Sequence, residues 1–213
     1  MELDDVLQKR RSIRKYMNIP VEKDKWTAVI ESAQFSASCG NLQDWKIIIV
    51  RKAENRKKLA QICHNQMWMA QAGIQIIVCA DMTKAKYYYG KRGVELFAVQ
   101  DCAVLMQNMI LKATDLGLST CWVGSFDDMR LRNFFSIPPS FAPQAVLVLG
   151  YGDEDVPAPP RSELVDITSF EQFGQRGSDF GKAMRFWHFG RAAKMLKEDA
   201  KTYIFDIFKK KKE

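Results

Sequence analysis

The spacing of apolar residues predicts helices and strands that are intermixed along the chain. Apolar positions recur at helical spacing in five segments: residues 2–9, 23–35, 54–63, 94–116 and 127–135. Three runs of mainly β-branched and apolar residues predict buried strands: residues 46–51, 74–80 and 145–151. Three unevenly spaced strands do not make a doubly wound parallel sheet. The pattern favours an α+β fold, with helices on both faces of a central mixed sheet.

The longest helical segment, 94–116, is apolar on most of its sides. Leu105 and Met109 mark one face, and Met106 belongs to a second. A helix of this kind must be buried on most sides. We therefore expect it at the centre of the domain or at a large interface between two subunits, with Gly117 as its C-cap.

The composition fits one sizeable domain. The chain has 213 residues, of which 47% are hydrophobic, and no linker rich in Pro, Gly or Ser divides it. We expect a domain over residues 1–176 and a separate tail over residues 177–213. No apolar run of transmembrane length stands out, and the first residues are acidic, unlike a secretory signal. These features predict a cytoplasmic protein.

The formal charge of +7 belongs mainly to the tail. Residues 182–213 carry ten Lys or Arg and four acidic residues, which leaves +1 for the rest. A nearly neutral body argues against a nucleic-acid groove. An apolar stripe between Phe189 and Phe208 predicts a basic amphipathic helix. This helix packs on its own domain or a partner subunit, which is the commoner arrangement, or lies on an anionic membrane surface.

Few residues are suited to acid–base or metal chemistry. His64 and His188 are the two histidines, and the five cysteines form no C-x-x-C pair. No metal site and no histidine base are therefore expected. Cys79 and Cys102 lie in apolar patterns and are predicted to fill the core.

Two polar segments are candidates for ligand binding. Arg10–Arg14 combines three guanidinium groups with the hydroxyl of Ser12, a set that suits a phosphate. Ser38–Trp45 is a loop in which Asn41 and Gln43 each offer a donor and an acceptor, as the pyrimidine edge of a flavin requires. Alone, the first segment reads as solvated surface and the second as a plain turn.

Together the two segments resemble the FMN-dependent nitroreductase family. Arg10–Tyr16 is similar to the family's opening motif R-R-S-x-R-x-F, and Ser38–Trp45 to its loop S-x-G-N-x-Q-P-W. Further segments resemble family segments in the same order: Gln100–Ala103, Gly117–Gly124, and Leu147–Gly152 followed by Arg161. The resemblance covers about residues 7 to 173.

Two positions depart from the family pattern. Asp44 stands where the family usually has proline, which changes the polarity of the loop. Tyr16 replaces a phenylalanine, which is a mild change. Residues beyond about 177 have no counterpart in the family.

The resemblance implies a role for each residue around the phosphate end of FMN. Arg10, Ser12 and Arg161 would hold the phosphate, with Arg11 on the phosphate or the ribityl chain. Arg14 would approach the N1/C2-carbonyl edge of the ring. A fixed cation there stabilises the charge that reduction places near N1.

The resemblance also implies contacts at the ring. Asn41 and Gln43 would meet the flavin or the substrate, and Ser38 with its neighbours would reach the flavin of the other subunit. The backbone N–H groups of Gly124 and Ser125 would lie near N5. The site would then exist only in a homodimer.

The implied activity is that of an FMN-dependent oxidoreductase. Hydride would pass from NAD(P)H through flavin N5 to a nitroaromatic, a quinone or a similar acceptor, in a ping-pong cycle. No G-x-G-x-x-G follows a strand, so NAD(P)H would visit the flavin pocket. No catalytic side chain is expected, because the flavin carries the chemistry. Cys121 is expected to be a small residue beside the flavin rather than a nucleophile.

Two alternatives stay open. One is a related flavin reaction: dehalogenation, azoline dehydrogenation or flavin breakdown. Family members differ mainly in the lid between the second strand and the central helix, where Tyr87–Tyr89 either stack on a flat substrate or serve as surface aromatics. The other alternative is a flavin-binding or membrane-docking protein without turnover.

Overall fold

The computed structural model describes residues 1–175, so the helix predicted in the tail lies outside the described residues. The chain divides into two compact units, residues 1–158 and the residues from 159 onward. The sheet and its covering helices all belong to the first unit. The described part of the second unit contains the short helix α7 (Leu164–Ile167). The domain boundary expected at residue 176 stays a prediction.

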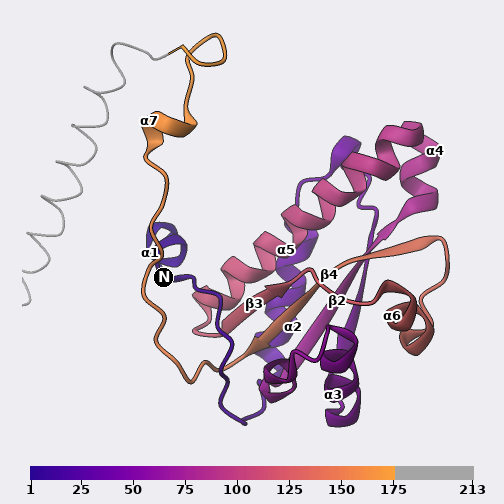
Figure 1. Cartoon of the computed structure of the whole chain (residues 1–213), viewed down its shortest axis with the longest axis vertical. Coiled ribbons are helices and arrows are strands. Elements are labelled where there is room, and N and C mark those ends of the chain that lie inside the picture. The colour runs from indigo at the N-terminus through magenta and orange to yellow at the C-terminus, as the bar shows by residue number, and fades with distance from the viewer. Residues whose placement is uncertain (176–213) are drawn as a thin grey trace, which may run out of the picture. The chain divides into compact units, whose positions relative to one another are not determined.

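The first unit is built on a four-stranded sheet (Figure 1). Its strands, in the spatial order β1-β2-β4-β3, pair antiparallel throughout: β1 (Trp45–Val50), β2 (Ile74–Asp81), β3 (Ser119–Val123) and β4 (Phe141–Gly150). Its α-helices are α1 (Leu3–Lys9), α2 (Lys23–Ser32), α3 (Ala53–Ile62), α4 (Met82–Arg92), α5 (Ala98–Asp115) and α6 (Asp128–Phe135). The expected α+β fold is confirmed. The sheet is mixed only through a parallel bridge between Ser12 and Thr120 at its β3 edge.

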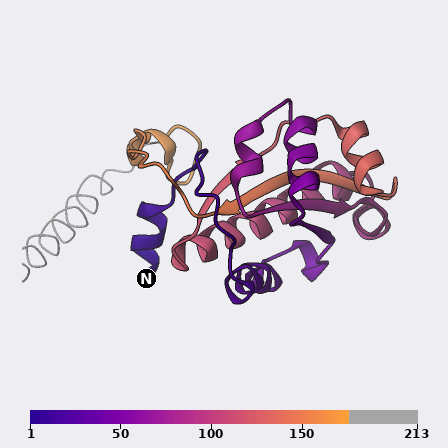
Figure 2. The ribbon, with the colours of Figure 1, turned by 90° about the horizontal axis from the view of Figure 1, so that it is seen from below.

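Helices cover both faces of the sheet (Figure 2): α2 and α5 lie on one side, and α3 and α6 on the other. Ile76 of β2 packs in the cluster that contains Leu105 of α5. Ile77, the next residue, packs in the opposite cluster with Leu59 of α3 and Leu131 of α6. Successive strand residues point to opposite faces of a sheet. Because helices cover both faces here, almost every residue of β2 is apolar.

The predicted central helix is part of a longer helical run. α4 leads through a π-helical turn (Gly93–Phe97) into α5. This run, Met82–Asp115, is long and apolar enough by length and composition to cross a membrane, although no continuous apolar run of that length stands out in the sequence. However, Gly90 breaks it with φ 57° and ψ −140°, and α5 packs into the core. These features identify α5 as the core helix that the sequence predicted.

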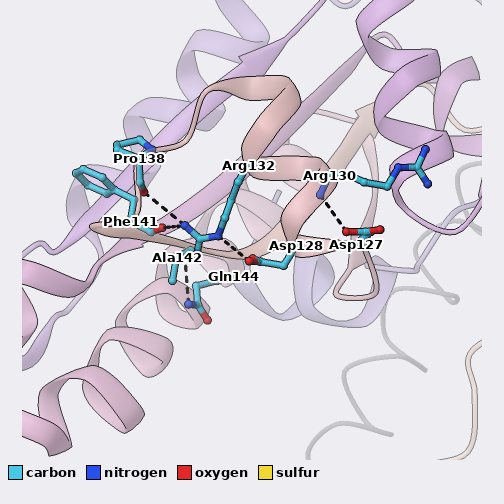
Figure 3. A network of polar contacts seen from close by, with 8 residues as sticks. All are labelled: Asp127, Asp128, Arg130, Arg132, Pro138, Phe141, Ala142 and Gln144. Carbon is cyan, nitrogen blue, oxygen red and sulfur yellow. Dashed lines mark hydrogen bonds and ion pairs between the residues drawn. The ribbon is translucent and has the colours of Figure 1, made fainter.

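Polar contacts around α6 fix the connection from β3 to β4 (Figure 3). Asp127 caps α6 by accepting the Arg130 backbone N–H at 2.9 Å. The guanidinium of Arg132 donates to the Asp128 carboxylate at 2.6 Å and to the Phe141 carbonyl at 2.5 Å. One side chain therefore joins the helix to the first residue of β4.

Replacing Arg132 with alanine is expected to lower the free energy of unfolding by about 1–3 kcal/mol, because a carbonyl and a carboxylate lose their charged donor. Urea unfolding followed by circular dichroism measures this loss. Arg130→Ala is the matched control: it removes the same charge from the same helix, and the Arg130 guanidinium lies outside the contacts drawn in Figure 3. The control is expected to change stability by less than about 0.5 kcal/mol, and equal losses in both variants would contradict the role of Arg132.

Candidate functional site

The segment predicted to hold the phosphate lies along the outer edge of β3. Ser12 bridges to Thr120, and the Ile13 N–H donates to the Thr120 carbonyl at 2.9 Å. Farther along, Tyr16 pairs with Gly152, just after β4. The backbone of residues 12–16 therefore continues the sheet and places its side chains beside β3.

Arg10 borders a cavity of about 180 Å³ between this segment, the end of α5 and the residues after β4. The Arg10 guanidinium has no hydrogen-bond or ion-pair partner within residues 1–175. It is therefore available to an anion. The cavity is lined by Lys9, Arg10, Arg11, Ile13, Thr114, Leu118, Ser119, Thr120, Glu154, Asp155 and Val156. The two acidic residues of this lining, Glu154 and Asp155, disfavour a phosphate, whereas its three cationic residues, Lys9, Arg10 and Arg11, favour one.

The guanidinium of Arg11 uses most of its donors on nearby backbone carbonyls. Its Nη1 donates to the carbonyls of Gln8 at 2.5 Å and Arg10 at 2.8 Å, and its Nε donates to the carbonyl of Val156 at 3.2 Å. Only Nη2 is left for a ligand within this arrangement. Arg10 is consequently the stronger candidate for the phosphate, and Arg11 stabilises the turn after α1.

Arg14 is exposed beside Cys121. The backbone N–H groups of Arg14 and Lys15 both donate to Oε1 of Glu154, at 2.5 and 3.0 Å. Burial raises the pKa of the Cys121 thiol, and the nearby charge of Arg14 opposes this rise only partly. A thiol with a raised pKa is a weak nucleophile, in line with the expectation that Cys121 is not catalytic.

The remaining predicted residues of this group are exposed. Gly124 and Ser125 directly follow β3, on the same edge of the sheet as Arg14. Arg161 belongs to the second unit and is also exposed. Its contact with the phosphate therefore stays a prediction.

The amide loop has an unusual backbone. Gly40, Asn41 and Gln43 have left-handed φ angles of 56°, 55° and 50°. The Gln43 N–H donates to Ser38 Oγ at 3.0 Å, and Gln43 Nε2 donates to Asn41 Oδ1 at 3.2 Å. The side chains of Asn41 and Gln43 are exposed, so their amide groups are accessible to a ligand.

Two residues that were not predicted to contact this loop hold it in place, one from the family segment Gln100–Ala103 and the other from the run Tyr87–Tyr89. Asp101, in the first turn of α5, accepts the Cys39 N–H with both carboxylate oxygens, at 3.0 and 3.1 Å. Tyr89 of α4 lies over Gly40, where a Cβ would stand 2.0 Å from the phenol oxygen. The loop is therefore positioned by the two helices that precede β3.

The two groups of predicted residues do not come together within one chain. The arginine segment lies beside β3, at one edge of the sheet. The amide loop leads into β1, at the opposite edge. Three strand spacings separate these edges, or about 14 Å. Moreover, the loop is tied to Asp101 while the Arg10 cavity is bordered by Thr114. Those residues are about 20 Å apart along α5.

Two larger cavities of the described chain contain none of the predicted site residues. One, of about 630 Å³, follows the outer edge of β1 and is lined in part by Ile49, Arg51 and Arg56. The other, of about 520 Å³, lies beside α4 and is lined in part by Tyr87 and Pro139. A search for the largest cavities would therefore not have identified either candidate segment.

The chain belongs to the nitroreductase family. The model of the Nitroreductase family matches residues 7–75 and 63–151, which together exceed half of the chain. Among relatives, an FMN reductase (NAD(P)H) from Bacillus subtilis (strain 168) is 27% identical over 168 residues. That match covers 73% of this chain and 68% of the relative. The family resemblance noted in the sequence is thus confirmed.

Solved structures agree with this assignment. NfrA2 of B. megaterium superposes with a TM-score of 0.76 and 26% identity, over 93% of this chain and 84% of that protein. An FMN-dependent nitroreductase from Clostridium difficile R20291 gives a TM-score of 0.70 and 25% identity, over 80% of this chain and 99% of that protein. The fold expected from the motifs is confirmed.

Replacing Gly40 with alanine is expected to destabilise the protein more than replacing Gly117. Both glycines have positive φ, 56° and 74°, but a Cβ at Gly117 would meet nothing within 4 Å, whereas one at Gly40 would meet the Tyr89 hydroxyl. The control should cost about 1 kcal/mol from backbone strain alone. Thermal unfolding of both variants, and of Gly40→Ala combined with Tyr89→Phe, measures the extra cost. If Tyr89→Phe recovers none of the stability lost in Gly40→Ala, the Tyr89 hydroxyl is not the group that the new Cβ meets.

Proposed function

We propose that this protein is an FMN-dependent NAD(P)H oxidoreductase that works as a homodimer, with each flavin held by residues of both subunits. The relatives named above as FMN reductase and FMN-dependent nitroreductase support the cofactor and the electron donor. The acceptor in this proposal is a nitroaromatic, a quinone or a similar flat molecule. The cytoplasmic location stays a prediction from the sequence.

The observation that carries the proposal is the separation of the two candidate segments. Arginines suited to a phosphate lie at the β3 edge, and amides suited to a flavin ring lie before β1. A second copy of the chain can bring the amide loop of one subunit to the arginines of the other. Apolar side chains left exposed support such a contact: Phe35 at 84%, Val99 at 43% and Val104 at 40%.

The residues beside β3 fit FMN in their chemistry. Arg10 has a guanidinium free for the phosphate within the described chain, and Arg14 supplies an exposed cation farther along the same edge. When bound, FMN supplies hydride transfer between donor and acceptor. The part of these side chains is to bind and orient the cofactor and to stabilise its negative charge.

The exposed aromatic residues of α4 favour a flat acceptor. Tyr87 and Tyr88 are 82% and 61% exposed, and Tyr87 also lines the cavity of about 520 Å³. Aromatic side chains gain from stacking on planar rings. This observation supports nitroaromatics and quinones over aliphatic acceptors.

The purified protein is expected to be yellow and to bleach when NADH or NADPH is added without oxygen. Addition of a nitroaromatic or a quinone should then restore the colour. Arg10→Ala is expected to weaken FMN binding by about tenfold to a hundredfold, because one charged contact to the phosphate is lost. Lys15→Ala is the control, since Lys15 pairs with Asp153 instead. A colourless protein that takes up no FMN would refute the proposal.

Mixing two defective chains is expected to restore FMN binding. One chain carries Arg10→Ala, and the other carries Asn41→Gly with Gln43→Gly, because glycine adopts positive φ without strain. If each site uses both subunits, a mixed dimer contains one intact site and one doubly defective site. Random exchange of subunits should then leave about a quarter of all sites intact. Fluorescence titration counts these sites, and no gain over the separate variants would place each site within a single chain.

A further inference from the structure

The least expected residue of the amide loop is Asp44, which replaces the usual proline of the family. Its side chain is 1% exposed. Neither carboxyl oxygen has an N–H or O–H donor of good geometry within residues 1–175. A buried carboxylate without donors is strongly disfavoured. The surroundings of Asp44 therefore favour its neutral form.

The carboxyl of Asp101 lies near that of Asp44, and it raises the pKa of Asp44 as a neighbouring charge and as an acceptor for its proton. Two ionised carboxylates cannot hydrogen-bond to each other, because each can only accept. A hydrogen bond between the two carboxyls therefore needs one proton, which the buried Asp44 carboxyl is suited to keep. Burial, followed by the neighbouring charge of Asp101, raises the pKa of Asp44 to about 6.

The other groups around the pair do not replace this proton. The backbone N–H of Asp44 and the ammonium of Lys84 both lower the pKa of Asp44, but burial and Asp101 outweigh them. That ammonium also donates to the carbonyl of Leu42 at 2.5 Å. Among the described residues, the other titratable groups near the pair are the thiol of Cys102 and the phenol of Tyr89, with the Cys39 thiol beside Tyr89.

Asp101 connects the pair to the loop. The same carboxyl that faces Asp44 accepts the Cys39 N–H, so its position determines where the loop lies. Asp44 is fixed on the other side, because its carbonyl accepts the Asp81 N–H at 2.7 Å and the next residue begins β1. If both carboxyls ionise, two like charges face each other in a buried place. The segment free to move in response is the loop.

We propose that Asp44 and Asp101 hold one proton between them and that this proton keeps the loop Cys39–Gln43 closed. Ionisation of the pair opens the loop and, with it, decreases FMN occupancy. Both are positioning residues, since they act through Cys39. The effect on FMN rests on the proposed function, whereas the effect on the loop does not.

The test compares the whole wild-type chain with Asp44→Asn between pH 4 and pH 8. Asparagine has nearly the same shape, cannot ionise, and offers Asp101 an N–H in place of the shared proton. Hydrogen exchange measures the protection of the Cys39 amide, and fluorescence titration measures the Kd for FMN. Both are expressed as ratios of wild type to variant at each pH. The ratios remove the pH dependence of intrinsic exchange and of the FMN phosphate, which itself titrates near pH 6.

We expect the relative protection of Cys39 to fall between about pH 4 and pH 6 and then to level off. The closed loop retains a proton that the open loop, with the ordinary pKa of aspartate, releases earlier. Relative FMN affinity should fall over the same range by at most about a hundredfold, a limit set by the pKa difference of about two units. Asp81→Asn is the control: it makes the same change at a neighbouring residue and still caps α4. It should leave both ratios flat.

A Cys39 ratio that stays constant from pH 4 to pH 8 overturns the proposal. Falling Cys39 protection with constant FMN affinity overturns the connection between the loop and the cofactor. If the relative protection of Cys39 falls as expected in a protein that never takes up FMN, the proposed function is refuted, whereas the proposal of a shared proton is supported.

Discussion

The burial of α5 against one face of the sheet is the packing interaction on which the other features depend. Leu105, Met106 and Met109 are fully buried there, against alternate residues of β2 and β4. Each such side chain contributes about 1.5–3 kcal/mol on burial. The same helix holds Asp101 beneath the amide loop at its first turn and borders the Arg10 cavity at its last. A change that tilts α5 would therefore disturb both candidate segments at once.

The sequence predicted the elements with strong periodicity and missed those without it. The helices at 23–35, 54–63 and 127–135 and the strands at 46–51, 74–80 and 145–151 correspond to observed elements within a few residues. β3 was missed because it is a short edge strand of mixed composition, Ser-Thr-Cys-Trp-Val. α4 was missed because its lysines and tyrosines leave it no continuous apolar face. Its stability comes from tertiary packing, which a local pattern does not reveal.

The candidate site was predictable only as far as its motifs extend. The motifs identified Arg10, Ser12 and the amide loop, but spacing alone could not show that Arg11 would turn toward backbone carbonyls. Asp101 carried a readable signal, since it is an acidic residue four positions before Leu105 on a buried helix face. Glu154, within an acidic run, carried none. Contacts between distant parts of the chain determine these roles, so they became visible only in the fold.

The left-handed backbone at Asn41 and Gln43 has a consequence for how this loop changes during evolution. Asparagine enters that conformation more readily than most residues. Selection for loop shape alone would therefore preserve an asparagine at position 41, whether or not a cofactor touches it. A descendant that had lost redox activity could therefore keep the same asparagine. Its presence in a related sequence is evidence for the shape of the loop, and not by itself evidence for catalysis.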